Sequence, residues 1–321
     1  MTTVAGTSTA IGELIATRIE FLSQNAIIAV QTADAVRCEL AQMPMEMAIA
    51  VRKRMNVMNV NTFTSLTEPA GTFTVFCPIL ASTLRRVRMA LDLTKMNDVT
   101  VRVVYQGASA SAGLATATVT AFSSKLWMSY HNYELEYYEK LRSDNFKNNS
   151  LLNMVTTDFY RETIPANAVT TSTIDIRCNG AAIWSSVYLL GPDGTVNPVY
   201  SGTIRANGTS VYEDVPSIIM NLDQDYTGSS AIAITSSAAA TEALHVRNPG
   251  PIYTFRHGLV KSEIDPNSVW QSGIVNFRGL SNPQFTVTHP SIANATLVVV
   301  HKVLTILTVS QDGSVRLTTT S

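Results

Sequence analysis

The chain has 321 residues and a formal net charge of -1, with 45% hydrophobic and only 15% charged residues. This composition excludes intrinsic disorder, which requires low hydrophobicity and high charge. It also excludes general nucleic-acid binding, which depends on clustered lysine and arginine. Thr, Ser, Asn, Ala and Val take the place of the missing charge, and that mixture favours strands and turns.

The first segment of the chain has a helical pattern. Apolar residues recur at three- and four-residue spacing with charged residues such as Arg18 between them: Ile11, Leu14, Ile15, Ile19 and Leu22. This spacing predicts an amphipathic helix over Thr9–Asn25 that extends towards Arg37. Its apolar face would pack on its own domain, or lie on a membrane surface or a partner.

After Met43-Pro44 the sequence changes to short runs of β-branched or alternating residues. Glycine, proline, asparagine or aspartate separates these runs, which is typical of half-buried strands. The predicted strands of this half are Asn59–Thr67, Gly71–Cys77, Thr83–Leu93, Val99–Tyr105 and Ala115–Phe122.

The segment Lys125–Leu141 interrupts the strand pattern. Its apolar residues fall on one helical stripe: Leu126, Tyr130, Tyr133, Tyr137 and Leu141. We expect a helix inserted between strands here, with a pair of tyrosine-rich strands as the alternative. The polar stretch Ser143–Ser150 then predicts an exposed loop.

From Ile164-Pro165 onwards the strand pattern returns and continues to the end of the chain. Gly191–Gly194 and Gln311–Ser314 are predicted tight turns between strands. The predicted strands are Thr171–Arg177, Ile183–Leu190, Val199–Ile204, Ser217–Leu222, Ala231–Ser236, Ile252–Phe255, Gly273–Phe277, Gln284–Thr288, Leu297–Val309 and Val315–Thr319. Both halves therefore favour antiparallel sandwiches or barrels over alternating strand–helix units.

The sequence contains no motif of a catalytic, cofactor or metal site. GxGxxG, GxxxxGK, HExxH and CxxC patterns are absent, and the five histidines have no ligand-like spacing. We therefore expect no enzyme activity, no cofactor and no metal. Cys38, Cys77 and Cys178 form no metal-type pair and are expected to be reduced thiols in a protein that assembles in a cytoplasm.

Membrane and targeting signals are also absent from the sequence. No apolar run approaches the roughly 20 residues that span a bilayer, and no secretion signal is visible. One short basic cluster, Arg52, Lys53 and Arg54, has the chemistry to contact phosphate or lipid headgroups, although a solvated face explains it equally well. Trp127, Trp184 and Trp270 are too separated in sequence to indicate an aromatic binding platform, and we expect each in a core.

The C-terminal fifth contains a Gly-x-x-Asn-Phe stretch before a strand, followed by a late apolar strand that contains His301. Its residues are Gly273, Asn276, Phe277, Arg278, Asn282 and Pro283, then Phe285–Val287 and Leu297–Ile306. This pattern resembles the closing segment of double jelly-roll major capsid proteins. Arg278 stands where the family pattern has serine, and Gly279-Leu280-Ser281 replaces its usual Arg-x-Asp.

This resemblance implies two tandem eight-stranded antiparallel jelly rolls with an N-terminal amphipathic helix and a short inserted helix. We expect a helical arm over residues 1–37, a first jelly roll over 38–165 that carries the inserted helix, and a second over 166–321. The mass of 34.8 kDa is similar to that of the small family members from membrane-containing bacteriophages, such as the lipid-containing phage of Flavobacterium.

The resemblance also implies a function. Family members form homotrimers of nearly hexagonal outline that tile an icosahedral shell, and most enclose a lipid membrane. The expected partners are further copies of the chain, minor capsid and vertex proteins, and the membrane, without sequence-specific nucleic-acid binding. The expected location is the virion, after assembly in the host cytoplasm.

In this interpretation, the N-terminal helix faces the membrane through Ile11, Leu14, Ile15, Arg18, Ile19 and Leu22. The lipid headgroups are contacted by Arg52, Lys53 and Arg54. The alternative is a jelly-roll lectin or receptor-binding spike.

Overall fold

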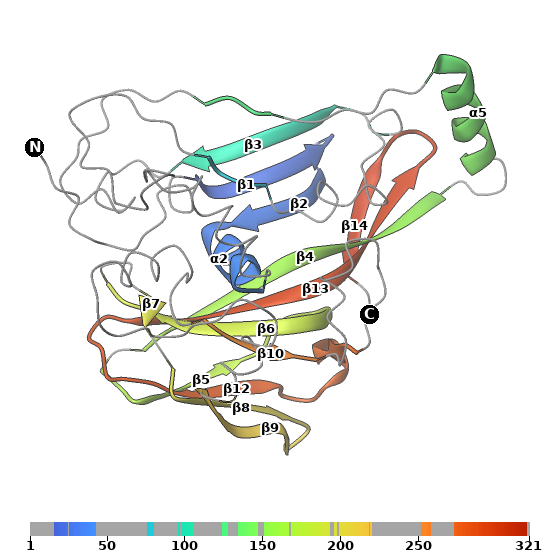
Figure 1. The fold of residues 1–321 in the computed structure, drawn as a ribbon. Coiled ribbons are helices and arrows are strands. Elements are labelled where there is room, and N and C mark those ends of the chain that lie inside the picture. The colour runs from blue at the N-terminus through green and yellow to red at the C-terminus, as the bar shows by residue number, and fades with distance from the viewer. Residues whose placement is uncertain are drawn as a thin grey trace, which may run out of the picture.

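The computed structural model describes residues 16–24, 26–42, 76–79, 96, 98–105, 124–127, 134–146, 151–166, 168–192, 196–197, 199–217, 219, 252–257 and 273–319. Most of these residues lie in strands, which form three sheets (Figure 1). Every strand pairing is antiparallel. The mainly β fold predicted from the sequence is therefore confirmed.

The second half of the chain forms a jelly roll of eight strands in two sheets. One sheet has the order β4-β13-β6-β10, and the other has the order β5-β12-β8-β9. The strands are β4 (Leu151–Pro165), β5 (Thr171–Asp175), β6 (Ala181–Leu190), β8 (Ser201–Ala206), β9 (Thr209–Pro216), β10 (Tyr253–Arg256), β12 (Gln284–Thr288) and β13 (Thr296–Ser310). Except for the β8–β9 hairpin, consecutive strands of this set lie on opposite sheets, which is the strand order of a jelly roll.

Four smaller elements complete this region. They are β7 (Val196–Asn197), β11 (Val275–Asn276), the 3₁₀ helix η3 (Phe277–Gly279) and β14 (Val315–Thr319). The β13–β14 hairpin confirms the turn predicted at Gln311–Ser314. In this turn Gly313 has a positive φ of 83°, and the Ser310 backbone N–H donates to the Ser314 carbonyl at 2.9 Å.

The two sheets of the jelly roll enclose a core of aromatic and aliphatic side chains. The rings of Phe255 and Phe285 meet edge to face, with 5.1 Å between their centroids. Gly202 of β8 lies against Phe255, where a Cβ would come within 2.8 Å of the ring. The close approach of the sheets at this position therefore requires glycine.

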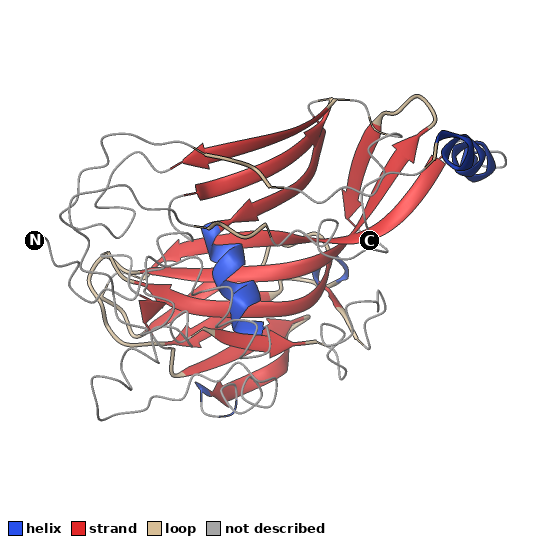
Figure 2. Ribbon diagram, turned by 45° about the horizontal axis from the view of Figure 1, so that its top comes forward, coloured by secondary structure: helices blue, strands red, loops and turns tan. Residues whose placement is uncertain are grey.

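β6 and β13 are covered on both faces. The sheet β5-β12-β8-β9 lies on one side, and helix α2 (Ala33–Gln42) lies across the other (Figure 2). Cys38 and Ala41 of α2 pack in one cluster with Trp184, Tyr188 and Val298. A strand that is buried on both faces needs apolar residues at successive positions, which explains the nearly continuous apolar sequence of β13.

The N-terminal segment forms strands where a helix was predicted. β1 (Ala16–Ser23) and β2 (Ala26–Thr32) are a hairpin, and β3 (Val99–Tyr105) pairs with the free edge of β1 in the order β2-β1-β3. The helix over Thr9–Asn25 is therefore wrong from Ala16 onwards. The helix of this region is α2, which begins only at Ala33.

The physical reason for this error is tertiary pairing. β1 finds a hydrogen-bonding partner in β3, about 80 positions along the chain, and such distant pairing overrides local helical spacing. Gln24 adopts a positive φ of 47° at the hairpin turn, where the chain reverses. Ile19 and Phe21 point to one core in the two-residue period of a strand.

The C-terminal hairpin completes the core of the N-terminal sheet. Leu307 and Val309 of β13 and Val315 of β14 pack with Ile19 and Phe21 of β1. The first residues of β13 belong instead to the jelly-roll core, since Leu297 and Val299 pack with Phe285. One strand of 15 residues therefore contributes to both cores.

β4 accompanies β13 over this whole distance. Its residues Leu151–Pro165 pair with Thr296–Ser310 without interruption. The domain boundary was expected at residue 166. β4 lies before this position but belongs to the jelly roll, and β14 lies after it but packs in the core of the N-terminal sheet. Each core therefore contains residues from both sides of the expected boundary. The division into domains stays a prediction.

The inserted helix exists but lies later than predicted. α5 spans Leu135–Phe146, whereas residues 124–127 form a loop with Trp127 82% exposed. The core position expected for Trp127 is therefore wrong, while Trp184 is buried and Trp270 lies outside the described residues. Leu135 and Tyr137 are largely exposed on α5, which projects beside the start of β4 (Figure 1).

The other strand predictions have three kinds of outcome: some strands are confirmed, some were missed or are wrong, and some lie outside the described residues. Val99–Tyr105, Gln284–Thr288 and Val315–Thr319 are confirmed to the residue. β4 and β9 were not predicted, and the described residues Ser217 and Ile219 of a predicted strand are helical. Outside the described residues lie the predicted strands Asn59–Thr67, Thr83–Leu93, Ala115–Phe122 and Ala231–Ser236. Among the helices that the structure describes, none is long and apolar enough to cross a membrane.

The two cores predict separable effects for two substitutions on β13. Leu307 and Leu297 are both fully buried, the first against β1 and the second in the jelly roll. We expect Leu307→Ala to cost about 2–5 kcal/mol and to increase amide hydrogen exchange in β1, β2 and β3, while β5 and β12 stay protected.

Leu297→Ala is the matched control, with the opposite pattern expected. Hydrogen-exchange mass spectrometry of the two variants measures both patterns. A uniform increase across both cores in both variants would contradict the separation.

Candidate functional site

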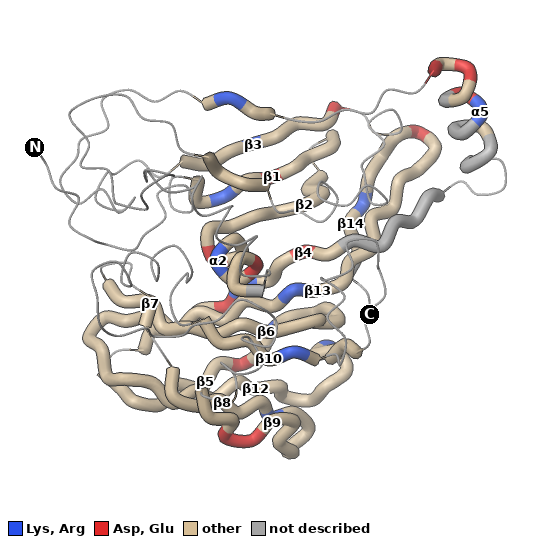
Figure 3. Tube along the Cα trace, in the orientation of Figure 1, with Lys and Arg blue, Asp and Glu red and all other residues tan. Residues whose placement is uncertain are grey.

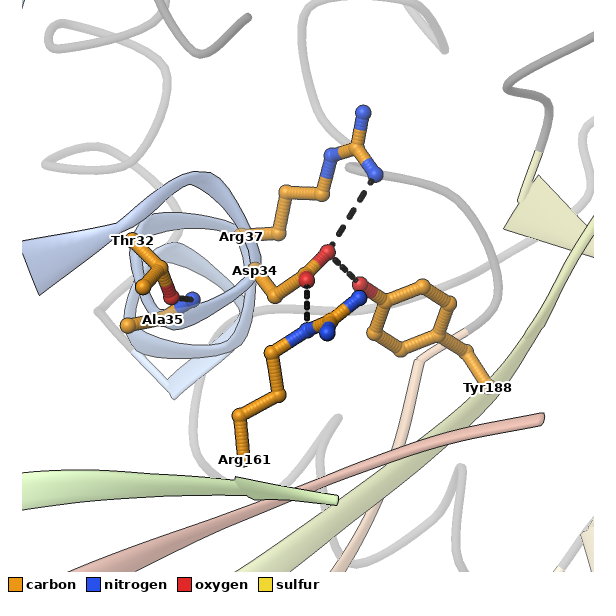
Figure 4. A network of polar contacts seen from close by, with 6 residues as sticks. All are labelled: Thr32, Asp34, Ala35, Arg37, Arg161 and Tyr188. Carbon is orange, nitrogen blue, oxygen red and sulfur yellow. Dashed lines mark hydrogen bonds and ion pairs between the residues drawn. The ribbon is translucent and has the colours of Figure 1, made fainter. Parts of the chain in front are cut away.

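Asp34, in the first turn of α2, is the centre of a buried polar network (Figure 4). Its carboxylate accepts hydrogen bonds from the Tyr188 hydroxyl of β6 and from Arg161 Nε of β4. Arg37 Nη1 lies 3.7 Å from the same carboxylate. Thr32 caps the helix, since its Oγ1 accepts from the Ala35 backbone N–H at 3.3 Å. One carboxylate thus joins α2 to two strands of the jelly roll.

Burial and the adjacent Asp34 charge together raise the pKa of Tyr188 well above its ordinary value. The phenol therefore stays protonated and donates to the carboxylate. Burial likewise raises the pKa of Cys38 on the same helix. The three cysteines form no disulfide in this structure, and burial raises the pKa of Cys178 to about 11.

A second buried ion pair lies one turn further along α2. Lys302 Nζ of β13 donates to both carboxylate oxygens of Glu39, at 3.1 and 3.0 Å. Both residues are 4% exposed. The ammonium also lies 5.9 Å from the ring centroids of Phe159 and Trp184. Because an unpaired charge here would be very unfavourable, the pair fixes the position of α2 on the sheet.

A third polar group lies where β4 meets β2. The Asp158 carboxylate accepts from the Phe159 backbone N–H at 2.9 Å. Burial raises its pKa from 3.8 to about 6, against the opposing effects of hydrogen bonds from Phe159 and Val30 and of the Arg18 charge. This carboxyl group therefore titrates near neutral pH at the contact between the jelly roll and the N-terminal sheet.

The jelly roll contains a buried histidine cluster that the sequence spacing did not reveal. Ser185 Oγ lies 2.9 Å from His257 Nε2 and 2.8 Å from His301 Nδ1. His301 Nε2 lies 3.5 Å from Glu162, and Phe277 packs on both imidazoles. Burial and the neighbouring His301 lower the pKa of His257 to about 3, so that it is neutral at physiological pH.

This cluster has the residue types of a serine hydrolase but not the exposure. Ser185 and His301 are 1% and 0% exposed, and Ser185 lies in the middle of β6. A nucleophile needs space for a reacting carbonyl beside it, which a closed core does not provide. The cluster therefore links β4, β6, β13 and His257, which directly follows β10, by polar contacts. Among the described residues, no group of three or more His, Cys, Asp or Glu is arranged to hold a metal.

The segment that carries the capsid resemblance is a structural turn. Asn276 caps η3, because its side chain accepts from the Arg278 backbone N–H at 3.2 Å. Phe277 is 2% exposed between the two histidines, and Asn282 adopts a positive φ of 48°. The Pro283 carbonyl accepts from the Ile176 N–H at 2.8 Å, which holds the turn to the end of β5. Gly273 and Arg278 are not among the buried residues.

The structure describes three of the residues predicted to face a membrane: Arg18, Ile19 and Leu22. Ile19 and Leu22 are 4% and 8% exposed in β1, where neighbouring elements cover them. Arg18 forms an ion pair with Glu20, which also pairs with Arg102 of β3. Outside the described residues lie Ile11, Leu14, Ile15, Arg52, Lys53 and Arg54.

Sequence reasoning missed the charged residues that dock α2. Asp34, Arg37 and Glu39 occur in a helix with few large apolar residues, so no stripe marked the buried face. The available signals were Thr32 as a cap and an acidic residue in the first turn.

Comparison with known proteins rests on structure alone, because no protein-family profile and no curated protein sequence matches the chain. The chain is similar to PBCV-1 VP54, solved as a crystal structure and fitted into a reconstruction of the virophage Sputnik, with a TM-score of 0.71 and 12% identity. That match covers 98% of this chain and 86% of VP54.

Two further capsid structures agree with this match. A quasi-atomic model of the PBCV-1 capsid has a TM-score of 0.67 and 13% identity, covering 98% of this chain and 86% of that one. The Faustovirus major capsid protein has a TM-score of 0.59 and 10% identity, covering 94% and 73%. The chain therefore has the fold of double jelly-roll major capsid proteins.

The Glu39–Lys302 pair predicts strongly non-additive substitutions. Lys302→Met leaves the Glu39 charge buried without its counter-charge, and we expect a loss of about 3–5 kcal/mol in unfolding free energy. Adding Glu39→Leu removes that charge, so the double variant recovers most of the loss. Urea unfolding of the two single variants and the double variant measures the coupling. Additive losses would contradict it.

His257 and Asp158 predict opposite pH dependences of stability. Between pH 3 and 6.5 the unfolded chain protonates His257 while the folded chain does not, so acid destabilises the fold. Between pH 3.8 and 6 the folded chain protonates Asp158 while the unfolded chain does not, so acid stabilises it. The two effects offset each other over most of this range.

Asp158→Asn removes the stabilising effect of acid. Between pH 6 and 4, we expect this variant to lose about 2–3 kcal/mol more stability than the unsubstituted chain. His257→Asn should give a difference of the opposite sign. Urea midpoints at pH 6, 5 and 4 measure both differences, and an unchanged slope in Asp158→Asn would refute the assignment.

Proposed function

We propose that the chain is a viral major capsid protein, a structural subunit without an active site. The observation that carries this proposal is the match to PBCV-1 VP54 over 98% of the chain at a TM-score of 0.71. A match over the whole length includes the N-terminal sheet, α2 and the jelly roll together. A single jelly-roll lectin module would account for only part of this architecture.

The charge distribution supports a subunit that contacts copies of itself. Only 15% of the residues are charged, and several of these are buried in internal pairs: Glu20, Asp34, Arg37, Glu39 and Lys302. Long stretches of the strands therefore carry no charge (Figure 3). Protein interfaces are depleted of charge at their centres, which makes uncharged strands suitable contact surfaces.

The proposal extends to the assembly. We infer a homotrimer of pseudo-hexagonal outline that tiles an icosahedral shell over an internal lipid membrane. Minor capsid and vertex proteins are the proposed partners, and the virion, assembled in the host cytoplasm, is the proposed location. A small lipid-containing bacteriophage is the proposed source. These inferences rest on the resemblance of the Gly273–Pro283 segment and on the size of the chain.

The mass and outline of the purified assembly test this function. We expect sedimentation and electron microscopy to give a stable trimer with a pseudo-hexagonal outline, or shell-like particles. A chain that stays monomeric at all concentrations and binds oligosaccharides would overturn the capsid proposal in favour of a lectin or receptor-binding module.

The proposed headgroup contacts are Arg52, Lys53 and Arg54. Their combined substitution by glutamine should reduce cosedimentation with vesicles that contain anionic lipid. Lys125, Lys140 and Arg316 are exposed and provide a control with the same loss of charge. Equal binding by both triple variants would exclude the assignment.

A further inference from the structure

The outer face of the sheet β5-β12-β8 is a regular array of small polar side chains. Alternate residues of these strands point away from the jelly-roll core, because Ile174, Ile204 and Phe285 occupy the inner positions. We call the outer array the threonine face. Its nine residues are Thr171, Thr173, Asp175, Ser201, Thr203, Arg205, Gln284, Thr286 and Thr288.

The strand register arranges these residues in three rows. Thr288 lies between Thr171 and Ser201, and Thr286 lies between Thr173 and Thr203. The third row has Gln284 at its centre, with Asp175 on one side and Arg205 on the other. Five threonines and a serine thus form an uncharged surface, and the only charges of the face lie at opposite edges of one row.

Hydrogen bonds hold the array in place. The hydroxyl groups of Thr173 and Thr286 lie 3.0 Å apart, and Gln284 Nε2 donates to Asp175 Oδ1 at 3.0 Å. The Asp214 backbone N–H donates to Thr203 Oγ1 at 2.9 Å. Side chains held in this way lose little further freedom on contact with another surface, which favours binding.

This face lies on the side of its sheet away from the other two sheets. The sheet β4-β13-β6-β10 covers its inner side, and the N-terminal sheet lies beyond that (Figure 1). Within the described part of the chain, no strand or helix packs on the outer side. Threonine hydroxyl groups make hydrogen bonds across an interface without the desolvation cost of an ion pair.

We propose that the threonine face packs on the same face of a second copy of this chain, around a two-fold axis parallel to β12. The charge pattern selects this axis. A rotation about a line along β12 places Asp175 of each copy opposite Arg205 of the other. A rotation about the row of Gln284 places like charges opposite each other, and a rotation about the row of Thr286 places both charges opposite uncharged side chains, so only the first axis pairs opposite charges. A self-complementary surface of this kind is what a two-fold interface requires.

This inference rests on the proposed capsid function and adds to it one contact between subunits. A two-fold contact joins a pair of chains and does not close a trimer. The threonine face would therefore connect neighbouring trimers, with Thr286 facing its own copy near the axis. Stable interfaces bury about 800 Å² per partner, so this array is the centre of a contact that also involves surrounding residues.

Charge reversal tests the pairing directly. In Asp175→Arg, residue 175 of each copy faces Arg205 of the other, so the contact contains two pairs of opposed arginines. In Arg205→Asp, the contact likewise contains two pairs of opposed aspartates. We expect each single variant to weaken association between trimers about 10- to 100-fold, because opposed like charges cost several kcal/mol. The double variant Asp175→Arg/Arg205→Asp should restore association. Sedimentation velocity over a concentration series measures each constant.

Two further pairs of variants control this experiment. Glu139→Arg and Arg316→Asp reverse exposed charges elsewhere and should leave association unchanged. Thr286→Lys places two ammonium groups near the axis and should weaken association, whereas Thr286→Ser should not. Thermal unfolding of every variant, measured below the concentration of association, shows whether the subunit itself is intact.

The outcomes separate this inference from the proposed function. Single variants that associate normally, or a double variant that stays as weak as the singles, would overturn the two-fold contact. Trimers and shells that still form in that case would leave the capsid function standing. An unsubstituted chain that never associates would overturn both.

Discussion

The pairing of β13 with β4 is the constraint on which the rest of the fold depends. The two strands run side by side over 15 residues, from the jelly-roll core to the core under the N-terminal sheet. Along this length the outer neighbour of β13 changes from β6 to β14. The two cores are therefore joined by continuous backbone hydrogen bonding, and rotation of one core against the other would break this ladder.

α2 adds a second connection of a different kind. The helix follows β2 directly and lies on β6 and β13, where Asp34 and Glu39 meet Arg161, Tyr188 and Lys302. Apolar packing alone would allow several positions of so small a helix on a sheet. Buried ionic contacts are unfavourable in any position that separates the partners, so they favour one position over others even where their net contribution to stability is small. Asp34, Glu39 and Lys302 thus act inside the molecule, where they position the helix.

The sequence could predict elements whose pattern is local. β3, β12 and β14 alternate with the two-residue period of half-buried strands, and their bounds were predicted correctly. The region of β1 and β2 was misread because Ile15, Ile19 and Leu22 fit a helical spacing, while the strand β3 that decides the structure lies far along the chain. The same limit applies to the buried contacts. Ser185 and His301 are 116 residues apart, and Glu39 and Lys302 are 263 apart, so no spacing rule brings them together.

The two faces of the jelly roll carry different kinds of side chain. On one face, α2 binds through buried charges and apolar side chains, which suits a contact made once during folding. The threonine face on the other sheet has hydroxyl groups and two charges, which suits the contact proposed above, one that must form and correct itself many times. Weak contacts of this kind become strong in a shell because each subunit is held by several of them at once. A chain with only 15% charged residues fits this use, since each contact then depends on register and shape instead of on a few strong ion pairs.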